Sequence, residues 1–139
     1  MNELIIYTDG AYSSARNQGG VGIVFTKDNK EIMHFSKMYK DTTNNQMEIR
    51  AIILALKSIK KPFDKITLVT DSQYCIGVMT QGWKRKKNQE LLAVYDAVYE
   101  HALSLCPNIE FSWTKGHEDC EFNNKADFLA VQASQEIVN

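Results

Sequence analysis

The sequence predicts an α/β fold on the basis of three observations. Short runs of β-favouring residues separated by polar turns are typical of strands; they span residues 4–10, 20–26, 31–37, 65–70 and 109–113. Helical periodicity and cap signals mark the segments that follow the later strands. Two runs end in the same pair, Thr8-Asp9 and Thr70-Asp71. If these strands are parallel neighbours, their tips lie about 5 Å apart, which predicts one shared site at that edge of the sheet.

Length and composition indicate a single globular domain over residues 1–139. A hydrophobic content of 44% and a charged content of 24% are ordinary for globular proteins and argue against a disordered or fibrous chain. The formal net charge of −1 neither identifies nor excludes a nucleic-acid-binding protein, because binding depends on where the charges lie.

The three cysteines, Cys75, Cys106 and Cys120, form no CxxC pair, and an odd number cannot close a disulfide framework. We therefore expect reduced thiols and a cytoplasmic location. No secretion signal is recognisable, and the longest apolar run, Ala51 to Leu56, is far shorter than the roughly 20 residues that span a bilayer. The expectation is a protein without a membrane partner.

The first three strands are expected to form an antiparallel meander. The first strand carries Asp9 at its carboxyl end, on the same face as Ile5 and Tyr7. It is followed by a polar loop at 10–19, strand 20–26, a turn at 27–30 and strand 31–37. This order brings the chain back to the edge that carries Asp9.

The next segment carries helix signals at both ends. Thr43 to Gln46 fits a capping box, and stop signals lie between Lys57 and Pro62. Glu48 is at the upstream end of a stripe that would pack on the sheet and comprises Ile52, Ala55, Leu56 and Ile59. A glutamate there can be a surface residue or a partner of the helix dipole. A right-handed crossover into strand 65–70 instead directs it toward Asp9.

Residues 72–81 are expected to form a short helix, for which Asp71 or Ser72 is a suitable N-cap. A capping role is thus an alternative reading of Asp71. The following segment, residues 82–88, places Trp83 before four consecutive cations. It can be a solvated connection between helices, or it can bind a sugar-phosphate backbone, for which an aromatic ring beside cations is suited.

Three further elements and a loop complete the chain. A helix is expected over residues 91–102, before the stop at Pro107, and a strand over residues 109–113. A polar loop at 115–122 then leads to a last helix from Asn123 or Asn124. This start places Asp127 in about the first turn of the last helix. An acid there can simply interact with the helix dipole.

Asp9, Glu48, Asp71 and Asp127 each have an ordinary structural reading, but the predicted topology directs at least three of them to one edge of the sheet. Carboxylate oxygens favour hard cations such as Mg²⁺ or Mn²⁺, and the lack of paired Cys or His ligands in the sequence argues against zinc. Because Mg²⁺ is typically shared with substrate phosphates, the sequence predicts phosphoryl-transfer chemistry.

The sequence contains an ordered set of motifs, which are Thr8-Asp9-Gly10, Thr42-Thr43-Asn44-Asn45-Gln46-Met47-Glu48, Thr70-Asp71-Ser72-Gln73-Tyr74, Trp113-Thr114-Lys115-Gly116-His117, Asn123 and Ala126-Asp127. On these motifs the chain resembles type 1 ribonuclease H over nearly its whole length. The resemblance implies a five-stranded mixed sheet in the order 3-2-1-4-5 with helices on both faces. It also implies an endonuclease that cleaves the RNA strand of RNA/DNA hybrids. We expect a monomer.

By this resemblance, Asp9 would bridge two Mg²⁺ ions about 4 Å apart when substrate is bound. Glu48 and Asp71 would complete one ion site and Asp127 the other, and Mn²⁺ could replace Mg²⁺. One ion would lower the pKa of the attacking water and the other would stabilise the leaving 3′ oxygen, giving 5′-phosphate and 3′-hydroxyl ends. His117 matches a loop histidine of the family that is thought to move protons or help product release.

The resemblance also implies how the hybrid is held. Asn44, Asn45 and Gln73 would contact 2′-hydroxyls in the minor groove, because amides both donate and accept hydrogen bonds. Thr43 matches a residue that binds a phosphate of the DNA strand, although the same hydroxyl is the predicted helix cap.

The basic segment is shorter than in many members of the family. It leaves Trp83, Lys84 and Lys86 as expected nucleic-acid contacts, so we expect weaker and more salt-sensitive substrate binding. Asp119 stands where the family often has glycine, and Asn124 where an acid is common. These two departures concern the geometry of the histidine loop and leave the metal ligands intact.

Two other functions fit part of the pattern. A non-catalytic nucleic-acid-binding module could keep this fold, although a complete set of acids favours catalysis. A phosphatase with an aspartyl nucleophile could use Asp9, but that chemistry usually needs a second acid two residues later, where this chain has Ala11. Cleavage of a hybrid with and without Mg²⁺ separates the nuclease from the binding module, and a trapped covalent phospho-enzyme would support the phosphatase.

Overall fold

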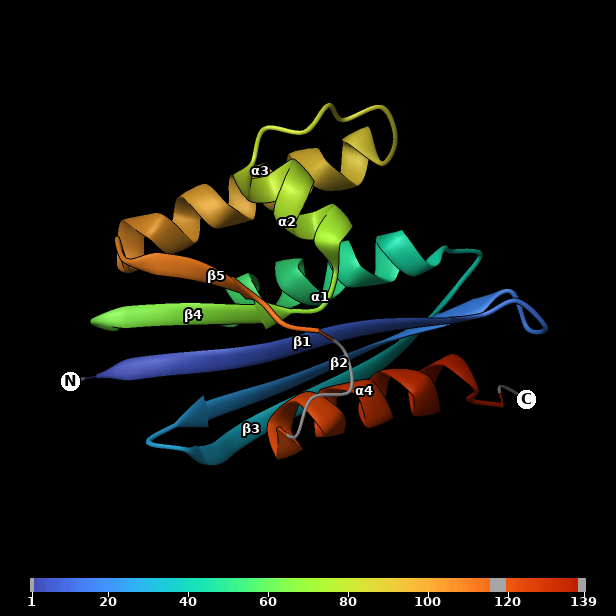
Figure 1. Cartoon of the computed structure of the whole chain (residues 1–139), viewed down its shortest axis with the longest axis horizontal. Coiled ribbons are helices and arrows are strands. Elements are labelled where there is room, and N and C mark those ends of the chain that lie inside the picture. The colour runs from blue at the N-terminus through green and yellow to red at the C-terminus, as the bar shows by residue number, and fades with distance from the viewer. Residues whose placement is uncertain (1, 116–119, 138–139) are drawn as a thin grey trace.

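A five-stranded mixed sheet runs through the molecule, with helices on both faces (Figure 1). The computed structural model describes residues 2–115 and 120–137. Its elements are β1 (Glu3–Ser13), β2 (Gln18–Lys27), β3 (Lys30–Lys40), α1 (Asn44–Lys57), β4 (Lys65–Thr70), α2 (Gln73–Thr80), α3 (Gln89–Leu105), β5 (Ile109–Trp113) and α4 (Glu121–Ser134). The strand order β3-β2-β1-β4-β5 confirms the predicted fold class.

The first strand is longer than predicted. β1 continues past Asp9 to Ser13, so the prediction of a loop over residues 10–19 is wrong for most of that segment. Residues 10–13 pair with residues 18–21 of β2, whereas the parallel ladder between β1 and β4 ends at Tyr7 and Val69. Pairing with β2 provides hydrogen-bond partners for the backbone of residues 10–13. The local β propensity of these residues does not reveal this pairing. Asp9 therefore lies in the middle of β1 and just beyond its pairing with β4.

The start of α1 is confirmed by its cap. The Thr43 hydroxyl accepts a hydrogen bond from the backbone N–H of Gln46 at 3.2 Å. The Gln46 side chain does not complete the predicted capping box, because it accepts a hydrogen bond from the Thr42 hydroxyl and donates one to Asn88. The cap thus uses half of the motif, and the other half ties α1 to the segment before α3.

The N-cap of α2 is Ser72. Its hydroxyl accepts a hydrogen bond from the backbone N–H of Cys75 at 3.1 Å. The choice between Asp71 and Ser72 is therefore settled, and the Asp71 carboxylate does not cap this helix.

The last helix begins earlier than predicted. α4 starts at Glu121, not at Asn123 or Asn124, so Asp127 lies at the end of its second turn. The prediction of a first-turn position is wrong, and the dipole explanation for this acid loses its basis. Cys120 occupies the N-cap position without a side-chain hydrogen bond, so no capping residue marks this start in the sequence.

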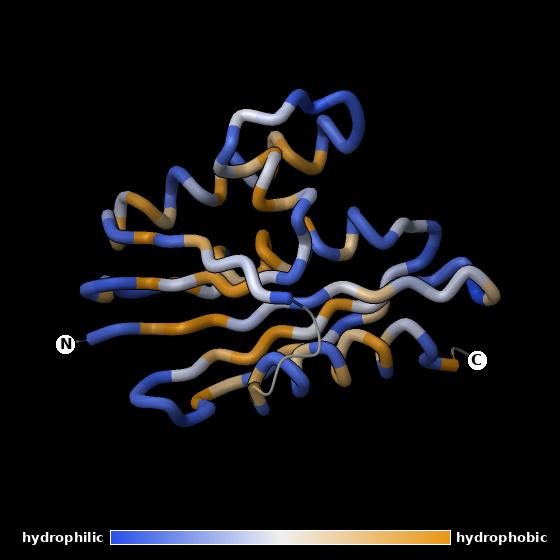
Figure 2. The backbone as a smooth tube through the Cα atoms, viewed as in Figure 1, coloured by the Kyte–Doolittle hydropathy of each residue, from blue (hydrophilic) through white to orange (hydrophobic). Residues whose placement is uncertain are grey.

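The two faces of the sheet are packed differently. The face under α1 carries a large apolar cluster, which includes Ile6, Ile52, Leu56, Leu68 and Leu92. The face under α4 carries a small cluster of buried residues, Val24, Phe122 and Ala126. Figure 2 shows that hydrophobic residues concentrate along the strands, while the connection between α2 and α3 is hydrophilic. Among the described residues, no helix has the length and apolar character needed to cross a membrane.

Candidate active site

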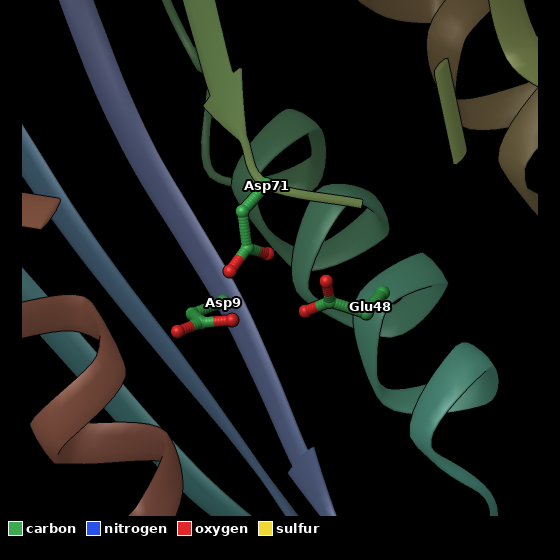
Figure 3. A group of neighbouring side chains, drawn as sticks. All are labelled: Asp9, Glu48 and Asp71. Carbon is green, nitrogen blue, oxygen red and sulfur yellow. The ribbon is translucent and has the colours of Figure 1, made fainter. Parts of the chain in front are cut away.

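Three of the predicted acids lie together beyond the carboxyl end of the β1–β4 ladder. Asp9 comes from β1, Glu48 from α1 and Asp71 from the residue that follows β4. Their side chains point toward one another (Figure 3). One oxygen from each carboxylate lies within 4.8 Å of the other two. The fold therefore brings three carboxylates from distant parts of the chain into reach of a single cation.

Asp9 is held by the long hairpin that β1 forms with β2. It lies opposite Gly22 in the antiparallel ladder, and its side-chain oxygen Oδ1 accepts a hydrogen bond from the backbone N–H of Gly10 at 2.9 Å. The residue is 8% exposed, which is low for an aspartate. Both its backbone and its carboxylate are thus fixed before any ligand arrives.

Contacts with β5 and with the α2 cap position Asp71. The Trp113 indole N–H donates a hydrogen bond to the Asp71 backbone carbonyl at 3.1 Å. The backbone N–H of Ser72 donates to the Thr70 hydroxyl, also at 3.1 Å. These bonds hold the backbone on both sides of Asp71 and leave its carboxylate free to face Asp9.

Glu48 is brought to the cluster by close packing of α1 on β1. A Cβ atom placed on Gly10 would lie 2.6 Å from the Glu48 backbone nitrogen, so any larger residue there would displace the helix. Glu48 is 5% exposed, and its Oε1 is buried without a hydrogen-bond partner in the described part of the chain. An unpaired buried carboxylate oxygen is costly unless a positive group balances it.

The pKa values of the buried acids also indicate that the cluster needs a positive group. Burial, and then the charge of Asp71, raises the pKa of Asp9 to about 8. Burial, followed by the charges of Asp9 and Asp71, raises the pKa of Glu48 well above its ordinary value. A cation among the three would favour their charged forms, and an all-oxygen donor set suits a hard divalent ion. The residues present therefore fit Mg²⁺ or Mn²⁺.

The fourth acid, Asp127, reaches the same cavity from the opposite face of the sheet. A Cβ atom on Gly22 would overlap the backbone carbonyl of Ala126, so α4 lies directly on β2 beside Asp127. Because Gly22 pairs with Asp9, this contact places Asp127 near Asp9. All four acids line one cavity of about 390 Å³. Asp127 is not part of the tight group of three oxygens described above.

Three of the predicted substrate contacts line this cavity as well. Asn44 and Asn45 lie in the first turn of α1, and Gln73 begins α2; all three side chains are exposed. Thr43 is exposed but its hydroxyl already accepts a hydrogen bond as the cap of α1. Polar side chains that both donate and accept thus surround the acids on the side of the two helix starts.

The basic segment lies apart from the acids. Trp83, Lys84 and Lys86 are exposed but are not among the residues that line the acid cavity. Arg85 is engaged, since its guanidinium donates to Asp96 and to a backbone carbonyl of α2. Of the four consecutive cations in this segment, Arg85 therefore holds α2 and α3 together.

His117 and Asp119 lie outside the described residues. The sequence alone missed other residues that shape the site. Gly10 and Gly22 set the height of two helices above the sheet, and Trp113 holds the backbone of Asp71. Gly10 and Trp113 were visible as parts of motifs, but no sequence signal indicated their contacts or those of Gly22.

Comparison with known proteins agrees with this geometry. Residues 1–135 match the family model described as RNase H. The chain is 38% identical to a ribonuclease H of Trichodesmium erythraeum, in an alignment that covers 97% of this chain and 90% of the relative. It is 35% identical to a ribonuclease H of Desulforamulus reducens, covering 98% and 90%, and 35% identical to a ribonuclease HI of Synechocystis, covering 99% and 91%.

Proposed function

Since the chain belongs to the ribonuclease H family, we propose that it hydrolyses the RNA strand of RNA/DNA hybrids by two-metal-ion catalysis. Membership of the family makes the protein an endoribonuclease. The observation that supports the catalytic proposal is the convergence of Asp9, Glu48 and Asp71 on one point. The expected products carry 5′-phosphate and 3′-hydroxyl ends.

The proposed ligand assignment follows the placement of the acids. Asp9, Glu48 and Asp71 would hold one divalent ion, and Asp9 with Asp127 would hold the other. When bound, such ions activate the attacking water and stabilise the leaving oxygen. The chain's own contribution is to hold four carboxylates ready without rearrangement, which is supported by the pairing of β1 and the close seating of both helices.

Substrate selection is proposed to rest on the amides around the cavity. Asn44, Asn45 and Gln73 can each donate to and accept from a 2′-hydroxyl, which is the group that distinguishes RNA from DNA. Thr43 would bind a phosphate of the DNA strand, and Trp83, Lys84 and Lys86 would contact the backbone further out. His117 is proposed to move a proton or assist product release.

The test is cleavage of an end-labelled hybrid with Mg²⁺, with Mn²⁺ and with chelator, beside duplex DNA and duplex RNA of the same sequence. We expect cleavage of the RNA strand of the hybrid only, and only with a divalent ion. Analysis of the cut ends checks for 5′-phosphate and 3′-hydroxyl groups.

Two outcomes would contradict the proposal. A hybrid that is bound but left intact under all ionic conditions would indicate the alternative, a non-catalytic nucleic-acid-binding module. Cleavage of duplex DNA at a comparable rate would show that the amides do not select for the 2′-hydroxyl.

Three broader features belong to the same proposal. Residues 1–139 would form a single ribonuclease H domain, acting as a monomer in the cytoplasm. Cys75 and Cys106 are buried free thiols, as expected in a reducing compartment. Sedimentation of the purified protein and location of a tagged chain would test the last two statements.

A further inference from the structure

A second cavity beside the acids is lined by both tryptophans of the chain. It measures about 370 Å³, and its lining consists of Gln73, Ile76, Gln81, Trp83 and Trp113. Trp83 is 50% exposed and Trp113 is 42% exposed, and the sequence contains no other tryptophan. Large aromatic rings are normally mostly buried, so two half-exposed indoles on one cavity indicate a binding surface.

Trp83 is held in place by the helix before it. Gly82 has a positive φ of 70°, which turns the chain back, and the Trp83 backbone N–H donates to the Gly77 carbonyl at 3.1 Å. The indole ring lies where a side chain at position 77 would be, because a Cβ atom on Gly77 would overlap it. One side of the ring therefore rests on α2 while half of its surface is exposed to solvent.

Trp113 is held by hydrogen bonds to the backbone at the end of β4. Its indole N–H donates to the carbonyl of Asp71, and the backbone N–H of the next residue, Thr114, donates to the Thr70 carbonyl at 2.9 Å. The polar atom of the indole is thus satisfied within the protein. What the ring offers to a ligand is its apolar surface.

The aromatic cavity adjoins the acid cavity through one shared residue. Gln73 lines both, and Asp71, which lines the acid cavity, accepts the hydrogen bond from Trp113. Lys84 follows Trp83 directly and forms no ion pair among residues 2–115 and 120–137, unlike its neighbour Arg85. A nucleic-acid strand that runs from the acids past Gln73 would therefore meet the two tryptophan rings, with the Lys84 ammonium group nearby.

We propose that this aromatic cavity binds an unpaired nucleobase of the RNA strand, next to the hybrid segment that is cut. The inference rests on the proposed function. Bases inside a duplex are stacked and cannot present their faces, whereas an unpaired base can stack on an aromatic ring. Gln73 and Gln81 supply amides for the edge of the base. RNA is assigned because Gln73 is the residue proposed to contact a 2′-hydroxyl.

The proposal predicts a preference for hybrids that end in single-stranded RNA. Three short hybrids of identical paired sequence are compared: one blunt, one with a few unpaired ribonucleotides on the RNA strand at either end, and one with unpaired deoxynucleotides on the DNA strand. We expect the RNA overhang to lower KM by about fivefold or more at one of the two ends, which corresponds to the stacking of a single base. The DNA overhang should not lower it.

Substitutions then separate stacking from simple support of Asp71. For each variant the measurement is the ratio of KM for the blunt hybrid to KM for the RNA-overhang hybrid. Trp83→Leu and Trp113→Leu should bring that ratio to about 1, while Trp113→Phe should retain part of it because a ring remains. If Trp113 merely holds the Asp71 backbone, its variants would lower kcat on both substrates and leave the ratio unchanged. Phe35→Ala, which removes an exposed ring on β3, is the matched control and should keep the native ratio.

A binding measurement keeps the test independent of catalysis and of altered folding. Because the chain contains two tryptophans, both on this cavity, intrinsic tryptophan emission of the native protein reports on it directly. In chelator, where no cleavage is expected, the RNA-overhang hybrid should change the emission more than the blunt hybrid does. Equal KM values and equal emission changes for the two hybrids would overturn the inference, as would an equal effect of the DNA overhang. Failure to cleave any hybrid would instead count against the proposed function.

Discussion

The two helices that carry acids, α1 and α4, reach the sheet from opposite faces and are held in different ways. Each rests on a glycine beside its acid: α1 on Gly10 next to Glu48, and α4 on Gly22 next to Asp127. α1 is also surrounded by the large apolar cluster that it shares with α2 and α3. The buried cluster under α4 is small and consists of Val24, Phe122 and Ala126.

This difference shows that two acids of one site can depend on different kinds of interaction. The position of Glu48 is determined by many side chains, so a single change in the core should lower stability before it moves the acid. The position of Asp127 depends more on the close backbone contacts that α4 makes with Gly20 and Gly22. A small change at the contact beside Asp127, at Gly22, should therefore affect activity more than stability.

The largest effect is expected on the α1 side, at the acid cluster itself. Asp71→Asn should abolish turnover, because it removes a proposed ion ligand, while the metal-free protein should be unchanged or higher in its free energy of unfolding. The reason is that the buried acids repel one another when no cation is present. Hybrid cleavage and urea unfolding in chelator are the measurements.

Asp96→Asn is the matched control for that substitution. Asp96 pairs with Arg85 on the surface, so we expect native turnover and at most a small loss of stability. An Asp71→Asn protein that lost both activity and fold would show that Asp71 acts mainly in the structure.

The next effect concerns the large cluster. Ile52 is fully buried between α1 and the sheet, and Ile52→Ala should lower the free energy of unfolding by about 2–5 kcal/mol. Turnover per folded molecule should change much less, because the remaining side chains still hold α1. Val131→Ala, at an exposed position of α4, should change stability by no more than about 0.5 kcal/mol. The comparison would be contradicted if Ile52→Ala lost most of its turnover per folded molecule while its free energy of unfolding stayed near the native value.

The glycine under α4 offers a sharper test. Gly22→Ala sets a methyl group against the backbone of α4, which cannot rotate away, so we expect a loss of about 1–3 kcal/mol and a reduced kcat as Asp127 shifts. Gly19→Ala, on the same strand, is the matched control because its new methyl meets the side chains of Met47 and Thr42 on the other face. Since Met47 is flexible, the control should cost less and keep more activity. Equal losses in both variants would remove the distinction between the two faces.

The last prediction is a pH dependence of stability in the metal-free protein, where no effect on turnover is measured. A folded-state pKa of about 8 for Asp9, against about 4 in the unfolded chain, means that the folded protein binds the extra proton between these values. This group's contribution to stability is therefore fully present below about pH 4 and is lost as pH rises toward 8. Metal-free unfolding free energies should fall with pH more steeply in the native protein than in Asp9→Asn. Identical slopes would show that Asp9 is not protonated in the metal-free fold.

Much of this architecture could be predicted from local patterns. The apolar runs, the Thr43 cap and the two Thr-Asp pairs were sufficient for the antiparallel meander, the parallel crossover and three converging acids, because these signals depend on neighbours in the sequence. The full strand order was implied by the resemblance to the family. The extension of β1 to Ser13 was missed because it depends on pairing with β2. The start of α4 was missed because Cys120 provides no cap signal.

Contacts that depend on tertiary structure could not be predicted at all. The hydrogen bond from Trp113 to Asp71 joins residues that are adjacent only once β4 and β5 pair. Arg85 looked like one more free cation until α3 brought Asp96 beside it. In each case the partner is supplied by the assembled fold and leaves no trace in the local pattern.

The continuation of β1 beyond Asp9 also determines which parts of the molecule can move during a reaction cycle. Asp9 belongs to the long antiparallel ladder of β1 and β2. The amide protons of this ladder exchange with solvent only when the ladder opens. An ion can arrive or leave, and a cut strand can depart, while this anchor remains still. Slow internal motions that accompany turnover should therefore be absent from the β1–β2 hairpin.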